Sequence, residues 1–521
     1  MNPKALADDD ATQSDIAVSS SVSVYELFRA RATKQPNAIA IQLGKRVTSY
    51  ADLRFRVDRL AAVLVSDGVS CGDRIAIFSE NCQEYIEVHL AAARIGAIVA
   101  CQNWRLTAEE LKHCVNLVDP KLLIYSDRHA HTVEQLGLGQ LPTLKLGDAY
   151  ETRLLNATDA DECPEVHWEC GLLILYTSGT TGPAKAALIS HRALVARMTV
   201  LSLDLDINRE DGFLAWSPMF HIGGSEHSLS TLMMGGVVHI TDGFDADHMA
   251  GIIAQHKLGW LLLVPAMADR LKASMVHNGS IVKGIKAVGS MPDLVPKSTI
   301  GELSTLFNAP FFNTFGATET GLPPASGGLI AVGTTPDELS KQLSSLCSLK
   351  IVGAEGENVP VDGIGEAYVR GPTLFSGYWG APKINSEVFQ QGWFRMGDLF
   401  KRNGDGTFDF VGRSKYLIKS GGENIYPAEI ENLLLSDPAI ADAVVVRKQD
   451  DRWGEVPVAF VSRANDTLDH DQVMALCNRD LANYKRPREI HFVDFDDLPR
   501  NSNGKIVREV VERWLYNPND D

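Results

Sequence analysis

A run of small hydroxyl residues and glycines between an apolar stretch and a lysine is the strongest chemical signal in the sequence. Leu172–Tyr176 is apolar, and the loop that follows holds Thr177, Ser178, Gly179, Thr180, Thr181, Gly182 and Lys185. Backbone N–H groups and hydroxyls in such a loop can surround phosphate oxygens, while the lysine adds positive charge. A flexible linker is the alternative, but linkers rarely follow an apolar strand. We therefore predict a phosphate-binding loop.

The same loop has the Gly-to-Lys spacing of a Walker motif, with two differences. Ala184 stands where that motif has Gly, and Ala186 stands where it has the Ser or Thr that binds Mg²⁺. A P-loop phosphotransferase is therefore the weakest interpretation. Any metal must be held by another part of the chain.

Further motifs follow the loop in order along the chain. They are Pro218–His221, Phe315–Glu319, Gly365-Glu366 with Arg370-Gly371, Gly392–Asp398, Gly412-Arg413 with Gly421–Ile425, and Pro499–Lys505. With the loop, they resemble the ordered signature of the adenylate-forming superfamily, which includes acyl-CoA synthetases, peptide-synthetase adenylation domains and firefly luciferase. The resemblance spans residues 24 to 508 and is strongest to the acyl- and aryl-CoA synthetase branch.

The resemblance implies a reaction in two steps. ATP converts a carboxylic acid to an acyl-adenylate and pyrophosphate, and coenzyme A then takes the acyl group and releases AMP. ATP and coenzyme A are the expected co-substrates, with Mg²⁺ as the metal. An acyl-AMP ligase that loads a carrier protein and a catalytically silent nucleotide- or acyl-binding relative remain alternatives. No carrier domain follows residue 521, so free coenzyme A is the expected acceptor.

The catalytic roles come from the matching motif positions. Lys505 is the predicted catalytic lysine, bridging the acid carboxylate and the α-phosphate. Glu319 is the predicted Mg²⁺ ligand, with Thr180 beside it, because a carboxylate suits a hard cation. The simpler interpretations are an exposed lysine in a turn and a glutamate at a helix N-terminus.

The nucleotide site is completed by residues of three motifs. The resemblance implies that Asp398 accepts both ribose hydroxyls and that Arg413 helps to hold the nucleotide. Phe315 occupies the position where the family usually has a Tyr stacked on adenine, and Gly316 and Thr318 lie beside it. A surface Asp–Arg ion pair and a core Phe are the simpler alternatives.

The acid is expected in a mainly apolar pocket. The positions that match the family's pocket are Phe220, His221, Ile222, Met267, Ser290, Thr314 and Gly316. They include no Lys or Arg for a second carboxylate, which favours a hydrophobic monocarboxylic acid of the fatty, alicyclic or aromatic class. Residues 218–221 lack the acidic residue that amino-acid-activating relatives carry nearby, so an amino acid is disfavoured.

The C-terminal part is expected to move between the two steps. The resemblance places the hinge at Lys415 and a channel for the pantetheine arm of coenzyme A along Ser420, Gly421 and Gly422, where glycines permit close backbone approach. Ala184, Ala186, Met396 and Tyr416 depart from the common pattern. They leave the rate of each half-reaction open.

The pattern of apolar residues predicts an α/β fold. Helices such as 50–64 alternate with strands such as Arg74–Phe78 and Leu122–Tyr125, which favours mainly parallel sheets. A hairpin turn at 403–406 and a helix from Pro427 to Leu434 are expected later. We predict a mobile tail over residues 1–22, a large multi-subdomain N-terminal part over 23–413, and a small mobile α/β C-terminal domain over 414–521.

Composition limits the partners. Lys plus Arg is 49 and Asp plus Glu is 66, so the net charge of −17 disfavours nucleic acid and anionic membranes. The 8 cysteines include no Cys-x-x-Cys pair, and no apolar run reaches the length of a membrane span. A cytoplasmic enzyme is expected, and the sequence leaves open whether it is a monomer or a homodimer.

Overall fold

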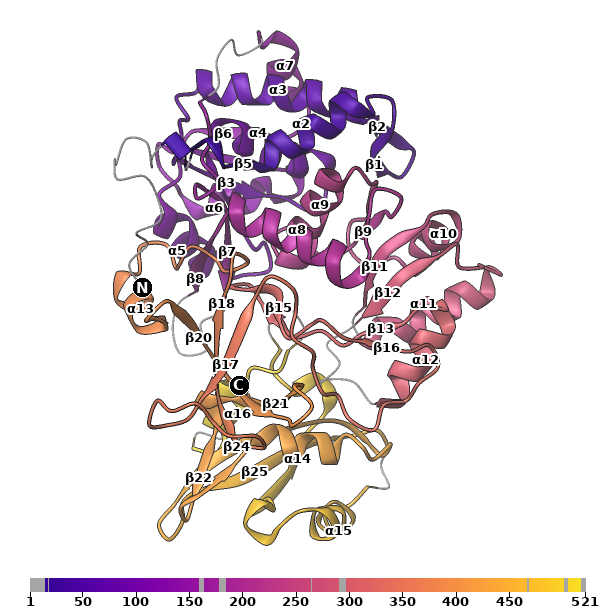
Figure 1. The fold of residues 1–521 in the computed structure, drawn as a ribbon, viewed down its shortest axis with the longest axis vertical. Coiled ribbons are helices and arrows are strands. Elements are labelled where there is room, and N and C mark those ends of the chain that lie inside the picture. Colours follow the sequence, from indigo (N-terminus) through magenta and orange to yellow (C-terminus); the bar gives the residue numbers. More distant parts are fainter. Residues whose placement is uncertain are drawn as a thin grey trace.

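The computed structural model describes residues 15–16, 18–158, 164–177, 184–263, 265–289, 297–465, 468–500 and 505–516. Most of the predicted N-terminal tail lies outside this part of the chain. Figure 1 shows a large N-terminal part and a smaller C-terminal part, coloured orange to yellow, at its lower end. Among the described residues, no helix has the length and apolar character needed to cross a bilayer.

A six-stranded sheet contains the two strands that flank the predicted phosphate-binding loop. Its strand order is β6-β5-β3-β4-β7-β8, and only the β7–β8 pair is antiparallel. The strands are β3 (Arg74–Phe78), β4 (Ile98–Cys101), β5 (Leu122–Tyr125), β6 (Thr143–Lys145), β7 (Gly171–Thr177) and β8 (Lys185–Ser190). The intervening helices are α3 (Tyr50–Ser66), α4 (Gln83–Ile95), α5 (Ala108–Val118), α6 (Ala130–Leu136) and α7 (Asp148–Asn156). The predicted strands β3 and β5 are confirmed to the residue.

Two four-stranded sheets follow. The first has the order β2-β1-β10-β9, with β1 (Ile39–Leu43), β2 (Arg46–Ser49), β9 (Phe213–Ala215) and β10 (Val238–Ile240). The second has the order β11-β12-β13-β16, with β11 (Leu258–Leu262), β12 (Ile285–Gly289), β13 (Phe311–Phe312) and β16 (Leu329–Ile330). Their helices are α2 (Val24–Lys34), α8 (His191–Leu205), α9 (Ile222–Met234), α10 (Ala246–Gln255), α11 (Pro265–His277) and α12 (Lys297–Phe307).

An antiparallel sheet connects these layers to the C-terminal part. It contains β17 (Ser348–Val352), β18 (Ile364–Arg370), β19 (Phe389–Gln390), β20 (Trp393–Arg402) and β21 (Phe408–Arg413), and helix α13 (Pro382–Val388) precedes β19. Strands β20 and β21 form the predicted hairpin, in which the Asn403 N–H donates to the Thr407 carbonyl over 2.9 Å. A two-stranded ribbon joins β14 (Gly316–Ala317) to β15 (Gly321–Pro324).

The C-terminal part has its own sheet and core. Strands β22 (Ile418–Ser420), β23 (Glu423–Ile425), β24 (Ile440–Asp450), β25 (Gly454–Arg463) and β26 (Glu489–Phe492) form the sheet. Helices α14 (Pro427–Leu434), α15 (His470–Asp480) and α16 (Arg508–Trp514) accompany it. Its apolar core includes Ile418, Ile430, Val445, Val461 and Cys477 and is separate from those of the N-terminal part. The domain boundary after residue 413 stays a prediction.

Candidate active site

Asp398 and Arg413 lie opposite each other on neighbouring strands. The register of β20 and β21 pairs the two residues, and Arg413 Nε lies 2.7 Å from Asp398 Oδ1. Asp398 is only 1% exposed, yet neither of its carboxylate oxygens has a hydrogen-bond partner of suitable geometry among the described residues. Buried polar groups are normally hydrogen-bonded. A buried carboxylate that is ion-paired but has no well-aligned hydrogen-bond donor among the described residues is therefore suited to accept hydrogen bonds from ligand hydroxyls.

The surroundings of Asp398 shift its ionisation. Burial raises the pKa of this carboxyl to about 6, and the Glu319 and Glu366 carboxylates act in the same direction. The positive charges of Arg413 and Lys505 oppose them. At neutral pH the group is therefore a carboxylate that lacks hydration, and donors from a ligand would stabilise it.

Lys505, from the last predicted motif, lies beside these residues. Burial of its ammonium group and the charge of Arg413 lower the pKa of Lys505, whereas Asp398 raises it. The residue as a whole remains exposed to solvent. The charge of Lys505 also contributes to lowering the pKa of His221. The structure thus brings Lys505, Asp398, Arg413 and His221 together, although they come from distant parts of the chain.

Glu319 is held by the segment that contains Tyr378. The Tyr378 hydroxyl donates to Glu319 Oε1 over 2.6 Å, and the Phe375 N–H donates to the Glu319 carbonyl over 2.8 Å. Lys185 Nζ lies 5.2 Å from the centroid of the Tyr378 ring. Burial and the Glu319 carboxylate raise the pKa of the Tyr378 hydroxyl, so it stays a donor. These contacts bring the predicted phosphate-loop lysine close to the predicted metal ligand.

The described residues contain no group of three or more His, Cys, Asp or Glu side chains able to hold a metal ion. A metal at Glu319 would therefore need ligands from the nucleotide, as expected for Mg²⁺ bound mainly through phosphates. Glu319 is half-buried, and its Oε2 accepts no hydrogen bond from the described residues. A hard-cation ligand with one oxygen held and the other available fits that role.

The loop after β13 carries the predicted adenine site. The Phe315 ring lies 4.8 Å from Phe400 and 5.0 Å from Phe410, so it belongs to an aromatic cluster. Gly316 is exposed, and a Cβ at this position would lie 2.0 Å from the Gly321 carbonyl oxygen. Only glycine fits there. The Thr318 carbonyl accepts a hydrogen bond of 3.2 Å from Arg197.

The predicted acid side begins at the start of helix α9. His221 is the N-cap residue, and its Nδ1 accepts a hydrogen bond of 3.2 Å from the Gly223 N–H. Burial, with Lys505 and Arg105 nearby, lowers the pKa of His221 to about 4, so the imidazole is neutral at physiological pH. Phe220 is buried, and Trp104 meets it edge-on with ring centroids 5.7 Å apart.

The other predicted pocket residues are more dispersed. Ile222 opens α9, and Met267 in α11 packs against the core around β11. The Thr314 hydroxyl lies 3.0 Å from Ser326 Oγ. The structure shows no direct contact of Met267 or Thr314 with His221 among the described residues. Ser290 and the loop residues Ser178, Gly179, Thr180, Thr181 and Gly182 lie outside the described part, while Thr177 pairs with Lys185 across the loop.

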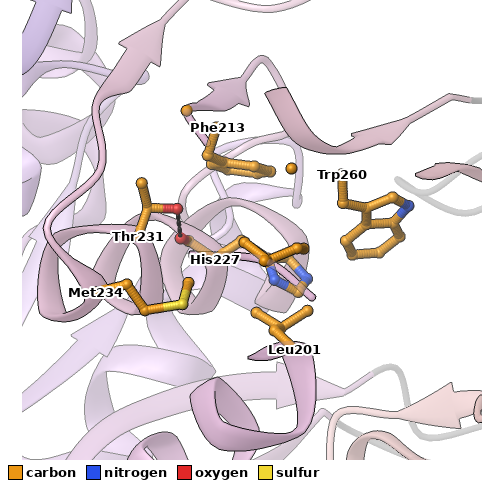
Figure 2. Close-up of a pocket in the computed structure, with 9 residues that line it drawn as sticks. Leu201, Phe213, His227, Thr231, Met234 and Trp260 are labelled. Atoms are coloured by element: carbon orange, nitrogen blue, oxygen red, sulfur yellow. Dashed lines mark hydrogen bonds between the residues drawn. The ribbon is translucent and has the colours of Figure 1, made fainter. Parts of the chain in front are cut away.

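An internal cavity of about 10 Å³ lies next to α9, a volume close to that of one water molecule. Figure 2 shows His227 directed towards Trp260, with Phe213, Leu201 and Met234 around it. The His227 and Trp260 ring centroids are 4.5 Å apart. Burial, with smaller contributions from Arg197 and His221, lowers the pKa of His227 to about 3. Of the predicted acid-binding residues that the structure describes, none lines this cavity.

The predicted coenzyme A turn, Ser420–Gly422, is held by residues at the start of strand β25. Ser420 pairs with Gly454, and the Gly421 N–H donates to the Trp453 carbonyl over 2.7 Å. Lys415 lies in a short 3₁₀ segment, Ser414–Tyr416, and its Nζ is 2.7 Å from Glu509 Oε1. The turn and Lys415 are thus both held by contacts within residues 414–521.

Sequence reasoning missed two supporting pairs. One is Tyr378 with Glu319, and the other is the buried ion pair of Arg197 and Glu226, at 2.7 Å between Nη1 and Oε2. Arg197 also donates to the Thr373 carbonyl over 2.8 Å. The only sequence signal was an aromatic residue directly after Gly377, which by itself predicts no site.

Comparisons with known proteins identify the family of the chain. Residues 28–379, more than half of the chain, match the AMP-binding enzyme family, and residues 429–505 match the AMP-binding enzyme C-terminal domain. The chain belongs to the AMP-binding enzyme family. It is an enzyme of the AMP-forming acid–CoA ligase class, and ATP and coenzyme A are its co-substrates.

The most informative relatives match almost end to end. The indoleacetate–CoA ligase of Aromatoleum aromaticum is 36% identical over 95% of this chain and 99% of its own length. A feruloyl-CoA synthase of an Amycolatopsis species is 33% identical over 93% and 97%. The crystal structure of ATP-bound MatB from Rhodopseudomonas palustris covers 95% of this chain and 99% of its own, with 27% identity and a TM-score of 0.81. The predicted α/β fold is therefore confirmed.

Proposed function

We propose that this ligase activates an aryl-substituted monocarboxylic acid. The observation that carries the proposal is the position of Lys505 beside both Asp398 and His221, which joins the nucleotide side to the acid side. The acid side is aromatic, with Phe220 packed against Trp104 and the Arg105 guanidinium 4.9 Å from the Trp104 ring centroid and 5.8 Å from that of Phe220. Relatives named for indoleacetate and for the feruloyl group support an aryl acid.

In the first step, an oxygen of the acid carboxylate attacks the α-phosphorus of ATP, and pyrophosphate leaves. Negative charge gathers on the α-phosphate, where the Lys505 ammonium would stabilise it. Asp398 would accept the ribose hydroxyls, and Arg413 would fix the carboxylate that does so. Because His221 is neutral, it adds no positive charge that would bind the substrate carboxylate at a distance from the α-phosphorus.

Mg²⁺ would be held by Glu319 and Thr180. The metal would supply positive charge to the phosphate oxygens and help pyrophosphate to leave. Lys185 beside Tyr378 would add charge on the same side. Phe315 would stack on adenine, with Gly316 and Thr318 beside it.

In the second step, the coenzyme A thiol attacks the acyl carbonyl, and AMP leaves. We propose that rotation about Lys415 replaces Lys505 at the site with the turn Ser420–Gly422. We also propose that the N-terminal part comprises residues 23–413 and that the mobile C-terminal domain comprises residues 414–521. We propose further that the enzyme is cytoplasmic.

The test is ATP-dependent product formation, followed by mass spectrometry with and without coenzyme A. The acids are indole-3-acetate, ferulate, 2-succinylbenzoate and octanoate. Indoleacetyl-CoA or feruloyl-CoA plus AMP supports the proposal, whereas a thioester from 2-succinylbenzoate alone, which is a dicarboxylate, would refute the monocarboxylic class. Octanoyl-CoA alone would refute the aryl preference, and acyl-AMP that persists with coenzyme A present would indicate a carrier protein as the acceptor.

A further inference from the structure

Tyr378 occupies a place between two groups that the reaction needs. Its hydroxyl donates to Glu319 Oε1 over 2.6 Å, while its ring faces Lys185 Nζ at 5.2 Å from the centroid. The side chain is 8% exposed, so solvent competes little for these contacts. One tyrosine thereby contacts both the predicted metal ligand and the predicted phosphate-loop lysine.

The backbone of Tyr378 is fixed from two sides. Asn385 accepts the Tyr378 N–H over 2.8 Å through Oδ1 and donates to its carbonyl over 2.9 Å through Nδ2. On the other side, the segment containing Tyr378 runs along the edge of β8. The Trp379 N–H donates to the Ala186 carbonyl over 2.8 Å, and the Leu188 N–H donates to the Gly377 carbonyl over 3.0 Å.

The same segment also fixes the backbone of Glu319. The Phe375 N–H donates to the Glu319 carbonyl, and the Phe375 ring packs edge-on against Tyr378 with centroids 4.9 Å apart. Glu319 is therefore held at its main chain and at one carboxylate oxygen by residues three positions apart. Its other oxygen is left for a ligand.

We propose that Tyr378 is a positioning residue that orients the Glu319 carboxylate towards a metal–nucleotide complex and keeps it in register with Lys185. The inference rests on the proposed role of Glu319 as a Mg²⁺ ligand. Tyr378 itself does not touch the reacting atoms. It restricts the carboxylate to one orientation, because a hydrogen bond to a charged group is stronger than one between neutral groups.

The test is Tyr378→Phe, which removes the hydroxyl and keeps the ring over Lys185. Binding of Mn²⁺·ATP is followed by the electron paramagnetic resonance of free Mn²⁺, which requires no knowledge of the acid. We expect the dissociation constant to rise, by less than the about tenfold to hundredfold that the complete loss of a hydrogen bond to a charged group would give, because this bond is also present in the free protein. In a Glu319→Ala background the same change should have no further effect, because Tyr378 acts through Glu319.

The matched control is Tyr150→Phe. Tyr150, in helix α7, also donates over 2.6 Å to a carboxylate, that of Glu87 in helix α4, and neither residue belongs to the predicted site. It should leave Mn²⁺·ATP binding unchanged. Wild-type binding in Tyr378→Phe, or an equal further loss in the Glu319→Ala background, would overturn the inference.

The two half-reactions provide a second readout. Tyr378→Phe should slow acyl-adenylate formation and leave the transfer from a supplied acyl-adenylate to coenzyme A at the wild-type rate. Equal loss of both steps would show a merely structural role. If wild-type protein binds Mn²⁺·ATP but activates no aryl acid, the proposed substrate class fails while the inference about Tyr378 stands on the binding data.

Discussion

The substitution Asp398→Asn tests whether Asp398 binds the nucleotide or only forms a structural ion pair. The substitution keeps the shape of the side chain and removes its charge. As Asp398 is buried and lacks hydrogen bonds, it would pair with ribose hydroxyls only when ATP is bound. A hydrogen bond to a charged group contributes about 1.5–3 kcal/mol, so the loss of one predicts ATP binding weakened about 10- to 100-fold.

The free protein should respond differently. Raising the pKa from 3.8 to about 6 corresponds to about 3 kcal/mol of unfavourable burial of the charged form. A buried unpaired amide costs about 1–3 kcal/mol, so the two costs nearly offset each other. We expect Asp398→Asn to change the stability of the free protein by less than about 2 kcal/mol.

Calorimetric titration with ATP and thermal unfolding would test both points. At about 100 times the wild-type dissociation constant, ATP stabilises the wild type by about 2.7 kcal/mol; a hundredfold weaker variant would retain about 0.4 kcal/mol. Arg413→Gln is a useful second variant because it changes the other residue of the ion pair. Arg413 is half-exposed, so a side chain at this position is easily hydrated. Strong destabilisation of free Asp398→Asn together with normal ATP affinity would refute the nucleotide role.

The pH dependence has a defined sign. The carboxylate is the form that accepts hydroxyls, so ATP affinity should be full above about pH 6 and fall as pH decreases below it. In Asp398→Asn this dependence should vanish. For stability the sign is opposite: the folded state binds the proton more tightly than the unfolded chain between about pH 4 and 6, so the contribution of Asp398 to stability decreases as pH rises through that window.

Three further outcomes are expected. Lys505→Ala should lower acyl-adenylate formation at least about 100-fold yet spare thioester formation from a supplied adenylate; equal loss of both steps would contradict its role. Lys415→Pro should impair the thioester step more than adenylation, and wild-type rates for both would remove the hinge assignment. Arg197→Ala should destabilise the protein by about 3–5 kcal/mol, because it leaves the buried Glu226 charge unpaired; an unchanged melting temperature would contradict this.

Local signals predicted several elements well. Strands β3 and β5 are short buried apolar runs bounded by polar residues, and α14 begins at Pro427 because proline is favoured at the first helical position. Helix α15 begins at His470 because the Asp469 side chain caps it. Strand β24 extends through polar residues to Asp450 because its end pairs with β25 in a long hairpin.

The supporting contacts of the site were beyond local reasoning. Tyr378 and Glu319 are 59 positions apart, and Arg197 and Glu226 are 29 apart. In neither pair does the spacing of the two residues along the chain predict a contact, because only the fold brings them together. The motif residues Asp398, Arg413 and Lys505 were predicted through resemblance, and their roles stay predictions.

Strand β21 ends at Arg413, and the proposed pivot lies two residues later. A nucleotide held by Asp398 and Arg413 would thus sit almost on the axis of rotation. Atoms near an axis travel little while distant ones travel far, so the C-terminal part could turn through a large angle without pulling on the adenylate. The acyl-adenylate would stay bound to the protein while the coenzyme A channel replaces Lys505 at the site. It would have little opportunity to dissociate or to react with water.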